Sequence, residues 1–261
     1  MIPGRTMNEL KALIFDVDGT LADNEQDGHR IAFNLAFADA GLDWTWDRET
    51  YAILLETFGG KERMLRYMED FQPDFDPPGG SEAFIRKVHG QKTQRYQELL
   101  KSGAIPLRPG VARLLREARK SGLGLAVAST TTEVNVTTLL SKTLGEPSIA
   151  WFDVIACGDV VARKKPAPDI FLYALEKLGL PAGQCLAVED SESGLASAMA
   201  AGLTTVVTVN ESTRQQDFTG AAIVLDQLGE PGSGFQVLAG DAGGATLVDV
   251  ALLERIHHKA R

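Results

Sequence analysis

Five short apolar runs separated by helical patterns constrain the fold of this 261-residue chain more than any other feature. The runs are KALIFD from Lys11, GLAVAST from Gly124, DVIAC from Asp153, CLAVED from Cys185 and TTVVTV from Thr204. Runs of this kind are typical of buried parallel strands. Helical patterns, such as residues 109–122 and 169–180, lie between them. The alternation predicts βαβ units, and therefore an α/β fold with a Rossmann-like, doubly wound parallel sheet.

The interval between the first two runs is much too long for one crossover helix. It contains four helix-like stretches and no convincing strand; the stretches are residues 28–41, 48–60, 61–71 and 81–103. We therefore predict a helical cap domain at residues 24–105, inserted into a core domain formed by residues 1–23 and 106–261. The glycine-rich segment after Gly229 predicts an excursion or a mobile loop, followed by a final helix within residues 248–261.

Charge and hydropathy exclude several classes of protein. A net charge of -9 argues against broad nucleic-acid binding, which relies on distributed positive charge. No run approaches the roughly 18 apolar residues of a membrane span, and residues 1–10 lack the apolar centre of a signal peptide. Cys157 and Cys185 have no metal or redox spacing, so they fit the core of a protein from a reducing compartment. We expect a cytoplasmic protein without nucleic-acid or membrane partners, and a monomer by default.

Polar side chains follow four of the predicted strands. They are Asp16 and Asp18 after the first, Ser129 and Thr130 after the second, Lys165 after the third, and Glu189 and Asp190 after the fourth. Ligands in open α/β sheets bind outside the carboxyl ends of the strands, so these side chains should meet in one crevice. Clustered carboxylates repel unless a cation lies between them, and Mg²⁺ is the hard, oxygen-preferring ion that fits best. Lys165, Ser129 and main-chain N–H groups near Thr130 add donors for an anionic group, and phosphate is suitable.

The same residues, in this order, carry a family resemblance. Asp-x-Asp-Gly-Thr at Asp16 to Thr20, a strand ending in Ser129, Lys165 in KPAPD and the acidic pair in VEDSESG resemble the haloacid dehalogenase superfamily of phosphatases. The resemblance implies that Asp16 attacks phosphorus to form an aspartyl-phosphate, and that Asp18 acts as the general acid and base. It also implies that Lys165 and Ser129 stabilise the transferring group electrostatically.

The resemblance also implies a ligand set for Mg²⁺. The carboxylate of Asp16, the main-chain carbonyl of Asp18 and the carboxylate of Asp190 would bind the ion, and Glu189 would bind it directly or through water.

Simpler interpretations exist for several of these residues. Asp16 and Asp18 could form a turn at a strand end, and Lys165 could mark a helix start. Asp169 fits a helix start as well and is left out of the catalytic set. Ser191 and Ser193 are either caps of the following helix or supports for the site.

The sequence FGGKER, residues 58–63, is the most informative part of the predicted cap. Main-chain N–H groups at a helix N-terminus, together with Lys61 and Arg63, could hold a second phosphate. The alternative is a solvated helix face with alternating charges.

The chain up to about Leu228 looks like the CbbY-type phosphatases of carbon-fixing organisms. The similar stretches include TLADNEQDGHRIAFNLAFADAGLDWTWD, FGGKER, VHGQKTQRYQELL and GDVVARKKPAPDIFLYALEKLG. Those enzymes remove phosphate from xylulose-1,5-bisphosphate, an inhibitory by-product of Rubisco in carbon fixation by the Calvin cycle. The resemblance therefore implies a phosphorylated sugar as the partner molecule.

The resemblance extends to residues of the cap. It implies that Glu25 and His29 contact the sugar, and that Lys61 and Arg63 bind its distal phosphate. His29 could instead be a packed or capping histidine, and one residue more than in the family lies between Asp18 and His29.

Several functions remain open on the sequence. A sugar phosphomutase resembling β-phosphoglucomutase uses the same two aspartates, but Thr20 after Gly19 favours hydrolysis. Phosphoglycolate phosphatase is a close neighbour, although the basic cap motif exceeds the needs of so small a substrate. A dehalogenase would leave Asp18, Glu189 and Asp190 without a role. A non-catalytic regulator that binds sugar phosphates would not need an intact nucleophile.

Overall fold

The computed structural model describes residues 9–55, 57 and 59–259. The chain divides into two compact units. One unit comprises residues 24–105, here called the cap, and the other comprises the residues on either side of it, here called the core. No helix among the described residues is both long enough and apolar enough to cross a membrane.

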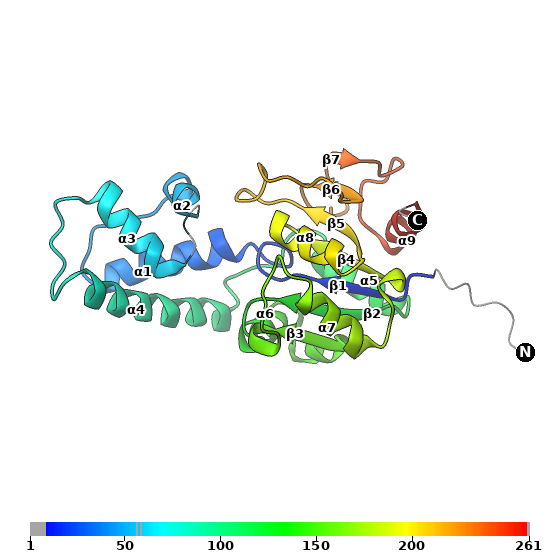
Figure 1. Cartoon of the computed structure of the whole chain (residues 1–261), viewed down its shortest axis with the longest axis horizontal. Coiled ribbons are helices and arrows are strands. Elements are labelled where there is room, and N and C mark those ends of the chain that lie inside the picture. The colour runs from blue at the N-terminus through cyan, green and yellow to red at the C-terminus, as the bar shows by residue number, and fades with distance from the viewer. Residues whose placement is uncertain (1–8, 56, 58, 260–261) are drawn as a thin grey trace, which may run out of the picture. The chain divides into compact units, whose positions relative to one another are not determined.

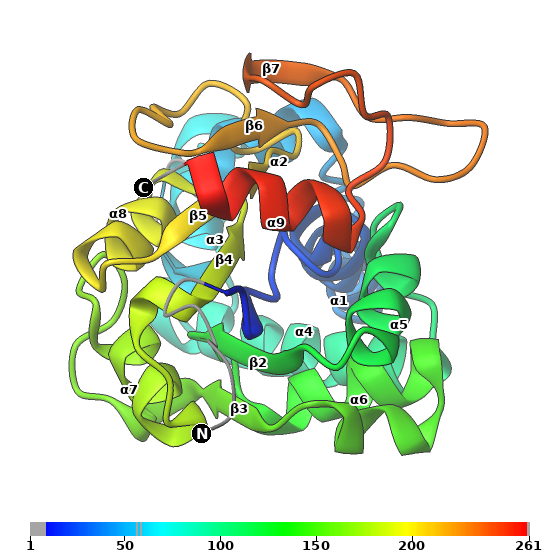
Figure 2. The same cartoon turned by 90° about the vertical axis from the view of Figure 1, so that its right-hand side faces the viewer.

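The core is built on a seven-stranded sheet with the strand order β3-β2-β1-β4-β5-β6-β7 (Figure 2). The strands are β1 Ala12–Phe15, β2 Gly124–Ser129, β3 Val154–Cys157, β4 Cys185–Glu189, β5 Thr204–Thr208, β6 Ile223–Leu225 and β7 Val237–Gly240. All neighbours are parallel except β6 and β7. The chain proceeds from β1 toward one edge and then from β4 toward the other, so the order reverses beside β1. The predicted doubly wound α/β sheet is confirmed, and such a reversal is where ligands bind.

Helices cover the sheet because each has one apolar face. They are α5 Val111–Lys120, α6 Glu133–Leu144, α7 Asp169–Leu178, α8 Glu192–Ala200 and α9 Val250–Lys259, with short 3₁₀ turns η2 Glu146–Trp151, η3 Gly158–Val160 and η4 Ala182–Gln184. In α5, Val111, Leu114, Leu115 and Ala118 are buried. Their spacing places them on one side of a helix. Small strand residues such as Ala126 allow Phe171 of α7 to pack closely against the sheet.

The C-terminal part of the core differs from the expectation in detail. Helix α9 lies within the predicted final helix, but the glycine-rich segment contains strand β7, and β6 was also not predicted. Strand β6 has only three residues, and every residue of β7 is exposed. Strand β6 is buried and apolar but shorter than the other five, and β7 lacks the buried apolar run by which those five were found.

The cap consists of helices (Figure 1). They are the π-helix η1 Glu25–His29, which continues into α1 Arg30–Asp39, followed by α2 Arg48–Leu55, α3 Gly60–Phe71 and α4 Ser81–Ser102. Aromatic side chains make up much of the hydrophobic core of the cap. Phe33, Phe37 and Trp46 pack with ring centroids 4.5–6.0 Å apart. The predicted helix at residues 48–60 is shorter, because α2 ends at Leu55 and residue 60 begins α3; residues 56 and 58 lie outside the described chain.

Candidate active site

The residues predicted at the ends of four strands do meet in one place. A cavity of about 210 Å³ in the core is lined by Asp16, Asp18, Ser129, Thr130, Lys165, Asp190, Ser191 and Ser193. The strand register explains the arrangement, because Phe15 pairs with Val127 and with Val188. The main-chain N–H of Asp16 donates to Val188 at 3.0 Å, which holds Asp16 beside the end of β4. Glu189 is fully buried and reaches the site through Lys165.

Lys165 joins two carboxylates at the centre of the site. Its Nζ lies 2.7 Å from Asp16 Oδ1 and 2.5 Å from Glu189 Oε1. Burial alone would lower the pKa of Lys165, but the charges of Asp16 and Glu189 outweigh burial and raise it. Lys165 therefore remains a cation beside the predicted nucleophile. The helix-start interpretation describes Asp169 better, since Asp169 begins α7 and pairs with Arg163 on the surface.

Three buried carboxylates surround a position suited to a divalent cation. Each of Asp16, Glu189 and Asp190 offers an oxygen, and these oxygens lie within 4.8 Å of one another. Burial raises the pKa of Asp16 to about 7, although Lys165 acts to lower it. Burial, Glu189 and Asp16 together raise the pKa of Asp190 well above its usual range. Lys165 and Arg108 do not outweigh these effects, so the oxygen ligands and their negative charge fit Mg²⁺.

Ser191 both caps a helix and supports the site. Its hydroxyl accepts from the N–H of Gly194 at 3.1 Å, as an N-cap of α8 does. The same hydroxyl donates to Glu189 Oε2 at 3.2 Å, and the N–H of Asp190 donates to that oxygen at 2.9 Å. Both interpretations of Ser191 are therefore correct. A Cβ on Gly194 would lie 1.9 Å from the Glu189 carboxyl group, so only glycine fits there.

Two further residues hold the site, and neither was singled out on the sequence. Asn210 Nδ2 donates to Asp190 Oδ2 at 2.7 Å. The Arg108 guanidinium donates to the carbonyls of Thr208 at 2.8 Å, Val209 at 2.6 Å and Gly19. Asn210 follows the fifth apolar run directly, so the strand-end rule that found the other residues would have found it as well. No comparable signal marks Arg108.

A second group of polar residues lies within the cap. Glu25 Oε2 accepts from the Tyr51 hydroxyl at 2.6 Å and from Arg63 Nη1 at 3.3 Å. Arg63 Nε also donates to the carbonyl of Thr57 at 3.0 Å. With His29 and Lys92, these residues form what we call the cap cluster: Glu25, His29, Tyr51, Arg63 and Lys92.

Lys92 is the buried cation of the cap cluster. Its Nζ lies 2.9 Å from His29 Nδ1, and 4.9 Å and 5.5 Å from the ring centroids of Phe33 and Tyr96. Burial first and Lys92 second lower the pKa of His29 to about 3. His29 is therefore neutral at pH 7 and accepts from the ammonium of Lys92. Sequence reasoning missed Lys92, because α4 carries other lysines and nothing in the pattern sets this one apart.

A π-helix positions the first two members of the cap cluster. Glu25 and His29 are its first and last residues. A π-turn contains one residue more than an α-helical turn of the same height and is frequent at functional sites. It is thus a physical means of accommodating one extra residue before His29.

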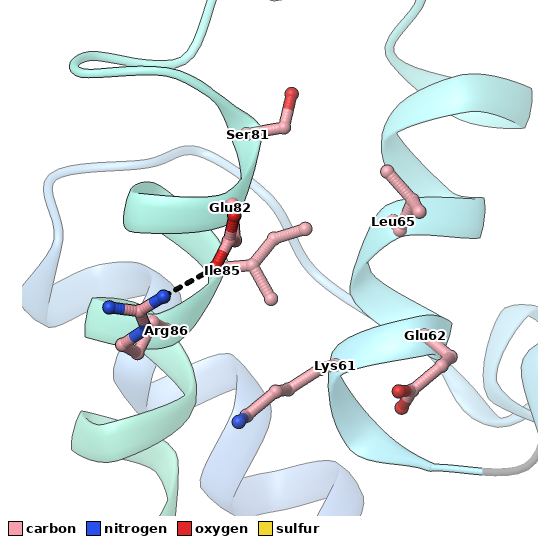
Figure 3. Close-up of a pocket in the computed structure, with 7 residues that line it drawn as sticks. All are labelled: Lys61, Glu62, Leu65, Ser81, Glu82, Ile85 and Arg86. Carbon is pink, nitrogen blue, oxygen red and sulfur yellow. Dashed lines mark hydrogen bonds and ion pairs between the residues drawn. The ribbon is translucent and has the colours of Figure 1, made fainter.

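The structure does not bring Lys61 to the cap cluster. Lys61 lines a separate cavity of about 400 Å³ between α3 and α4, with Leu65, Ile85 and Arg86 (Figure 3). Figure 3 shows Lys61 directed toward α4 and Glu62 directed away from it. Arg63, two residues further along α3, instead contacts Glu25 and Tyr51. The predicted pair of Lys61 and Arg63 is therefore divided between two places in the cap.

Comparison with known proteins identifies the family. The model of the haloacid dehalogenase-like hydrolases matches residues 10–202. The chain belongs to this family. Among the haloacid dehalogenase-like hydrolases it is 55% identical to the protein CbbY of Rhodobacter capsulatus over 213 residues, which are 82% of this chain and 91% of that protein. Plasmid-encoded CbbY of Cupriavidus necator is 47% identical over 250 residues, 95% and 97% of the two chains.

A solved structure of a CbbY protein has the same fold. A mutant of CbbY from Rhodobacter sphaeroides in complex with xylulose-(1,5)-bisphosphate is 46% identical and aligns with a TM-score of 0.68. The alignment covers 84% of this chain and 94% of that chain. This haloacid dehalogenase-like hydrolase is therefore an enzyme of the CbbY type, a phosphatase.

Proposed function

We propose that the protein is a Mg²⁺-dependent phosphatase of xylulose-1,5-bisphosphate that acts through an aspartyl-phosphate. The observation that carries the chemistry is the meeting of Asp16, Lys165 and Asp190 in one buried cavity. The substrate is proposed from the likeness to CbbY of Rhodobacter sphaeroides, which binds that bisphosphate.

The reaction has two steps that share one acid–base group. A carboxylate oxygen of Asp16 attacks phosphorus, the bond between phosphorus and the sugar oxygen breaks, and Asp18 gives its proton to the leaving alkoxide. Water then attacks the aspartyl-phosphate and Asp18 takes a proton from that water. The products are the sugar monophosphate and inorganic phosphate, and Asp16 is regenerated.

The other core residues bind charge rather than make bonds. Lys165 holds the attacking carboxylate and neutralises charge on the transferring group, to which Ser129 and the main chain near Thr130 donate hydrogen bonds. Asp16, the Asp18 carbonyl and Asp190 hold Mg²⁺, and Glu189 completes the set. When bound, the ion supplies positive charge to the phosphoryl oxygens.

The cap supplies contacts to the rest of the substrate. Glu25 and His29 contact the sugar hydroxyls. Arg63 binds the distal phosphate, and Lys61 adds positive charge to the cap. The cap cluster supports this proposal, because it holds the cations Arg63 and Lys92 beside Glu25 among the described residues of the cap, while His29 is neutral.

Phosphate release with Mg²⁺ tests the proposal directly. The panel contains xylulose-1,5-bisphosphate, ribulose-1,5-bisphosphate, fructose-1,6-bisphosphate, 2-phosphoglycolate and β-glucose-1-phosphate, with Asp16→Asn as the blank. We expect strong preference for the xylulose compound over its ribulose epimer. A flat profile would retain the phosphatase and remove the substrate assignment, and conversion of β-glucose-1-phosphate to an isomer without phosphate release would indicate a mutase.

A further inference from the structure

Asp190 is held by two hydrogen-bond donors, one on each carboxylate oxygen. The Thr20 hydroxyl donates to Oδ1 at 3.2 Å, and Asn210 Nδ2 donates to Oδ2 at 2.7 Å. Thr20 belongs to the Asp-x-Asp-Gly-Thr motif, whereas Asn210 lies in the loop after β5. Hydrogen bonds to both oxygens restrict rotation of the Asp190 carboxylate about its Cβ–Cγ bond.

The side-chain amide of Asn210 has only one possible orientation. Its Oδ1 accepts from the main-chain N–H groups of Ser212 at 2.9 Å and Thr213 at 3.2 Å. The main-chain N–H of Asn210 donates to the Thr213 hydroxyl at 3.1 Å. An amide flipped by 180° would set its NH₂ against two donors and its oxygen against the Asp190 carboxylate. Asn210 must therefore present its NH₂ to Asp190.

The backbone of Gly19 lies close to the contact between Asp190 and Asn210. A Cβ on Gly19 would lie 2.2 Å from Asp190 Oδ2 and 2.7 Å from Asn210 Nδ2. Gly19 also has a φ of 96°, a conformation that favours glycine. The bare backbone of the catalytic loop is thus packed directly against the contact between Asp190 and Asn210.

We propose that Asn210 is a positioning residue for the metal site, which orients Asp190 for Mg²⁺ through its NH₂ group. This inference rests on the assignment of Asp190 as a Mg²⁺ ligand in the proposed function. Hydrogen-bond partners of metal ligands fix ligand orientation, and their loss weakens metal affinity by about 10- to 100-fold. Asn210 is not among the residues that line the 210 Å³ cavity, so we expect its effect to be on metal binding rather than on the chemical step.

The alternative is that Asn210 only shapes its loop. Its Oδ1 closes a turn with Ser212 and Thr213, and asparagine is favoured in such turns for that contact alone. The two roles use different atoms of one side chain. A serine hydroxyl can accept the turn hydrogen bond in place of Oδ1, but it is too short to reach Asp190.

Isothermal titration with MgCl₂ in the absence of substrate separates these roles. The variants are Asn210→Ser, which retains a turn acceptor, and Asn210→Ala, which removes both contacts. Gln216→Ala is the matched control, because Gln216 lies in the same loop and accepts from Glu192 without touching Asp190. Asp190→Asn is the reference for loss of the ligand itself. Melting temperatures and the Mg²⁺ dependence of phosphate release are measured for each protein.

We expect both Asn210 variants to bind Mg²⁺ about tenfold or more weakly, with kcat at saturating Mg²⁺ within about twofold of the wild type. Gln216→Ala should bind Mg²⁺ normally. Wild-type Mg²⁺ affinity in Asn210→Ser overturns the proposal, whatever Asn210→Ala does, because the turn acceptor alone would then suffice. Normal Mg²⁺ affinity in Asp190→Asn would overturn the metal assignment itself, which distinguishes that failure from failure of the positioning role.

Discussion

The carboxylate site of the core and the cap cluster are both polar groups within well-packed units, yet their charges are unbalanced in opposite directions. In the core, four carboxylates face two cations, Lys165 and Arg108; the carboxylates are those of Asp16, Asp18, Glu189 and Asp190. In the cap cluster, as far as the structure describes the cap, Arg63 and Lys92 accompany one carboxylate, that of Glu25. Burial is the main cause of both pKa shifts, and neighbouring like charges add to them: the pKa of Asp16 rises to about 7 and that of His29 falls to about 3.

The difference indicates what each region binds. Burial and an excess of like charge both shift a pKa so that the neutral form of the group is favoured, and a bound counter-charge offsets both effects. Among the described residues, the carboxylates of the core site outnumber its cations, and Mg²⁺ would supply positive charge there. The cations of the cap cluster outnumber the carboxylate of Glu25, and a phosphate group would supply negative charge there. Under the proposed function, a bisphosphate with a divalent ion would supply both kinds of charge, whereas a monophosphate would supply no second phosphate to the cap cluster.

The largest expected effect comes from removing the proposed nucleophile, the carboxylate of Asp16. Asp16→Asn should lower turnover by about 10⁴-fold or more, as removal of a nucleophile does. The variant should melt no lower than the wild type without Mg²⁺, because it relieves repulsion among buried carboxylates. Phosphate release and thermal unfolding measure the two effects. Turnover within about tenfold of the wild type would place the nucleophile elsewhere.

Comparing variants of Asp18 and Asp190 separates acid–base catalysis from metal binding in the core. Asp18→Ala should lower kcat by about 10²- to 10⁴-fold, as loss of a general acid does, with Mg²⁺ affinity nearly unchanged. Asp190→Asn should instead weaken Mg²⁺ binding. Calorimetric titration with MgCl₂, run beside phosphate release, distinguishes them. If Asp18→Ala loses as much Mg²⁺ affinity as Asp190→Asn, the Asp18 side chain binds the metal.

The core could be predicted closely because its chemistry follows from strand ends. A parallel sheet brings the carboxyl ends of its strands to one edge, so Asp16, Ser129 and Glu189 were placed together without knowledge of any distance. Lys165 could be added to this group because it lies in the loop that follows the third strand. Arg108 was missed, because its partners are main-chain carbonyls, which every residue possesses.

The cap was harder to predict because helix packing decides which side chains converge. Lys61 and Arg63 are two positions apart on α3, and residues at that spacing face different directions on a helix. The sequence placed them together, whereas the structure directs Lys61 to the cavity beside α4 and Arg63 to Glu25. Lys92 comes from α4, and only packing of α4 against η1 brings it to His29.

Removing the cations of the cap cluster tests whether that cluster binds a second phosphate. Lys92→Met and Arg63→Met should each raise the KM for xylulose-1,5-bisphosphate about tenfold or more, since a charge-assisted contact contributes about 1.5–3 kcal/mol. The KM for a monophosphate should change less. Lys61→Ala should also raise the bisphosphate KM more than the monophosphate KM, but by a smaller factor, because Lys61 lies outside the cap cluster.

Arg86→Ala is the matched control for the cap variants. Arg86 lines the cavity of Lys61 and pairs with Glu82 on the surface of α4. It should leave both KM values unchanged. Equal increases for bisphosphate and monophosphate in Lys92→Met would mean that the cap cluster does not bind a second phosphate, and a lowered melting temperature would identify variants whose KM reflects a damaged cap.

The smallest expected effect is a pH dependence of stability that arises in the cap. His29 has a pKa of about 3 when folded and about 6.5 when unfolded. Below pH 6.5 the unfolded chain therefore binds a proton that the folded cap does not, and stability falls as pH falls. Between pH 7 and pH 5 the loss is roughly 2 kcal/mol. His29→Asn keeps an acceptor for Lys92 but does not titrate, so its stability should fall less.

Urea unfolding of the wild type and of His29→Asn at pH 7 and pH 5 measures this effect. The change in the free energy of unfolding between the two pH values is compared for the two proteins. Asp16 acts with the opposite sign, because its raised pKa lets the metal-free folded state bind a proton below pH 7. That contribution is present in both proteins and cancels in the comparison, since distant sites are additive. The lowered pKa of Glu25 acts only below its usual value of 4.5 and lies outside the window. Equal pH dependence in the two proteins would show that His29 gains its proton in the folded cap as readily as in the unfolded chain. The positive charges of Arg63 and Lys92 would then not dominate the cap cluster.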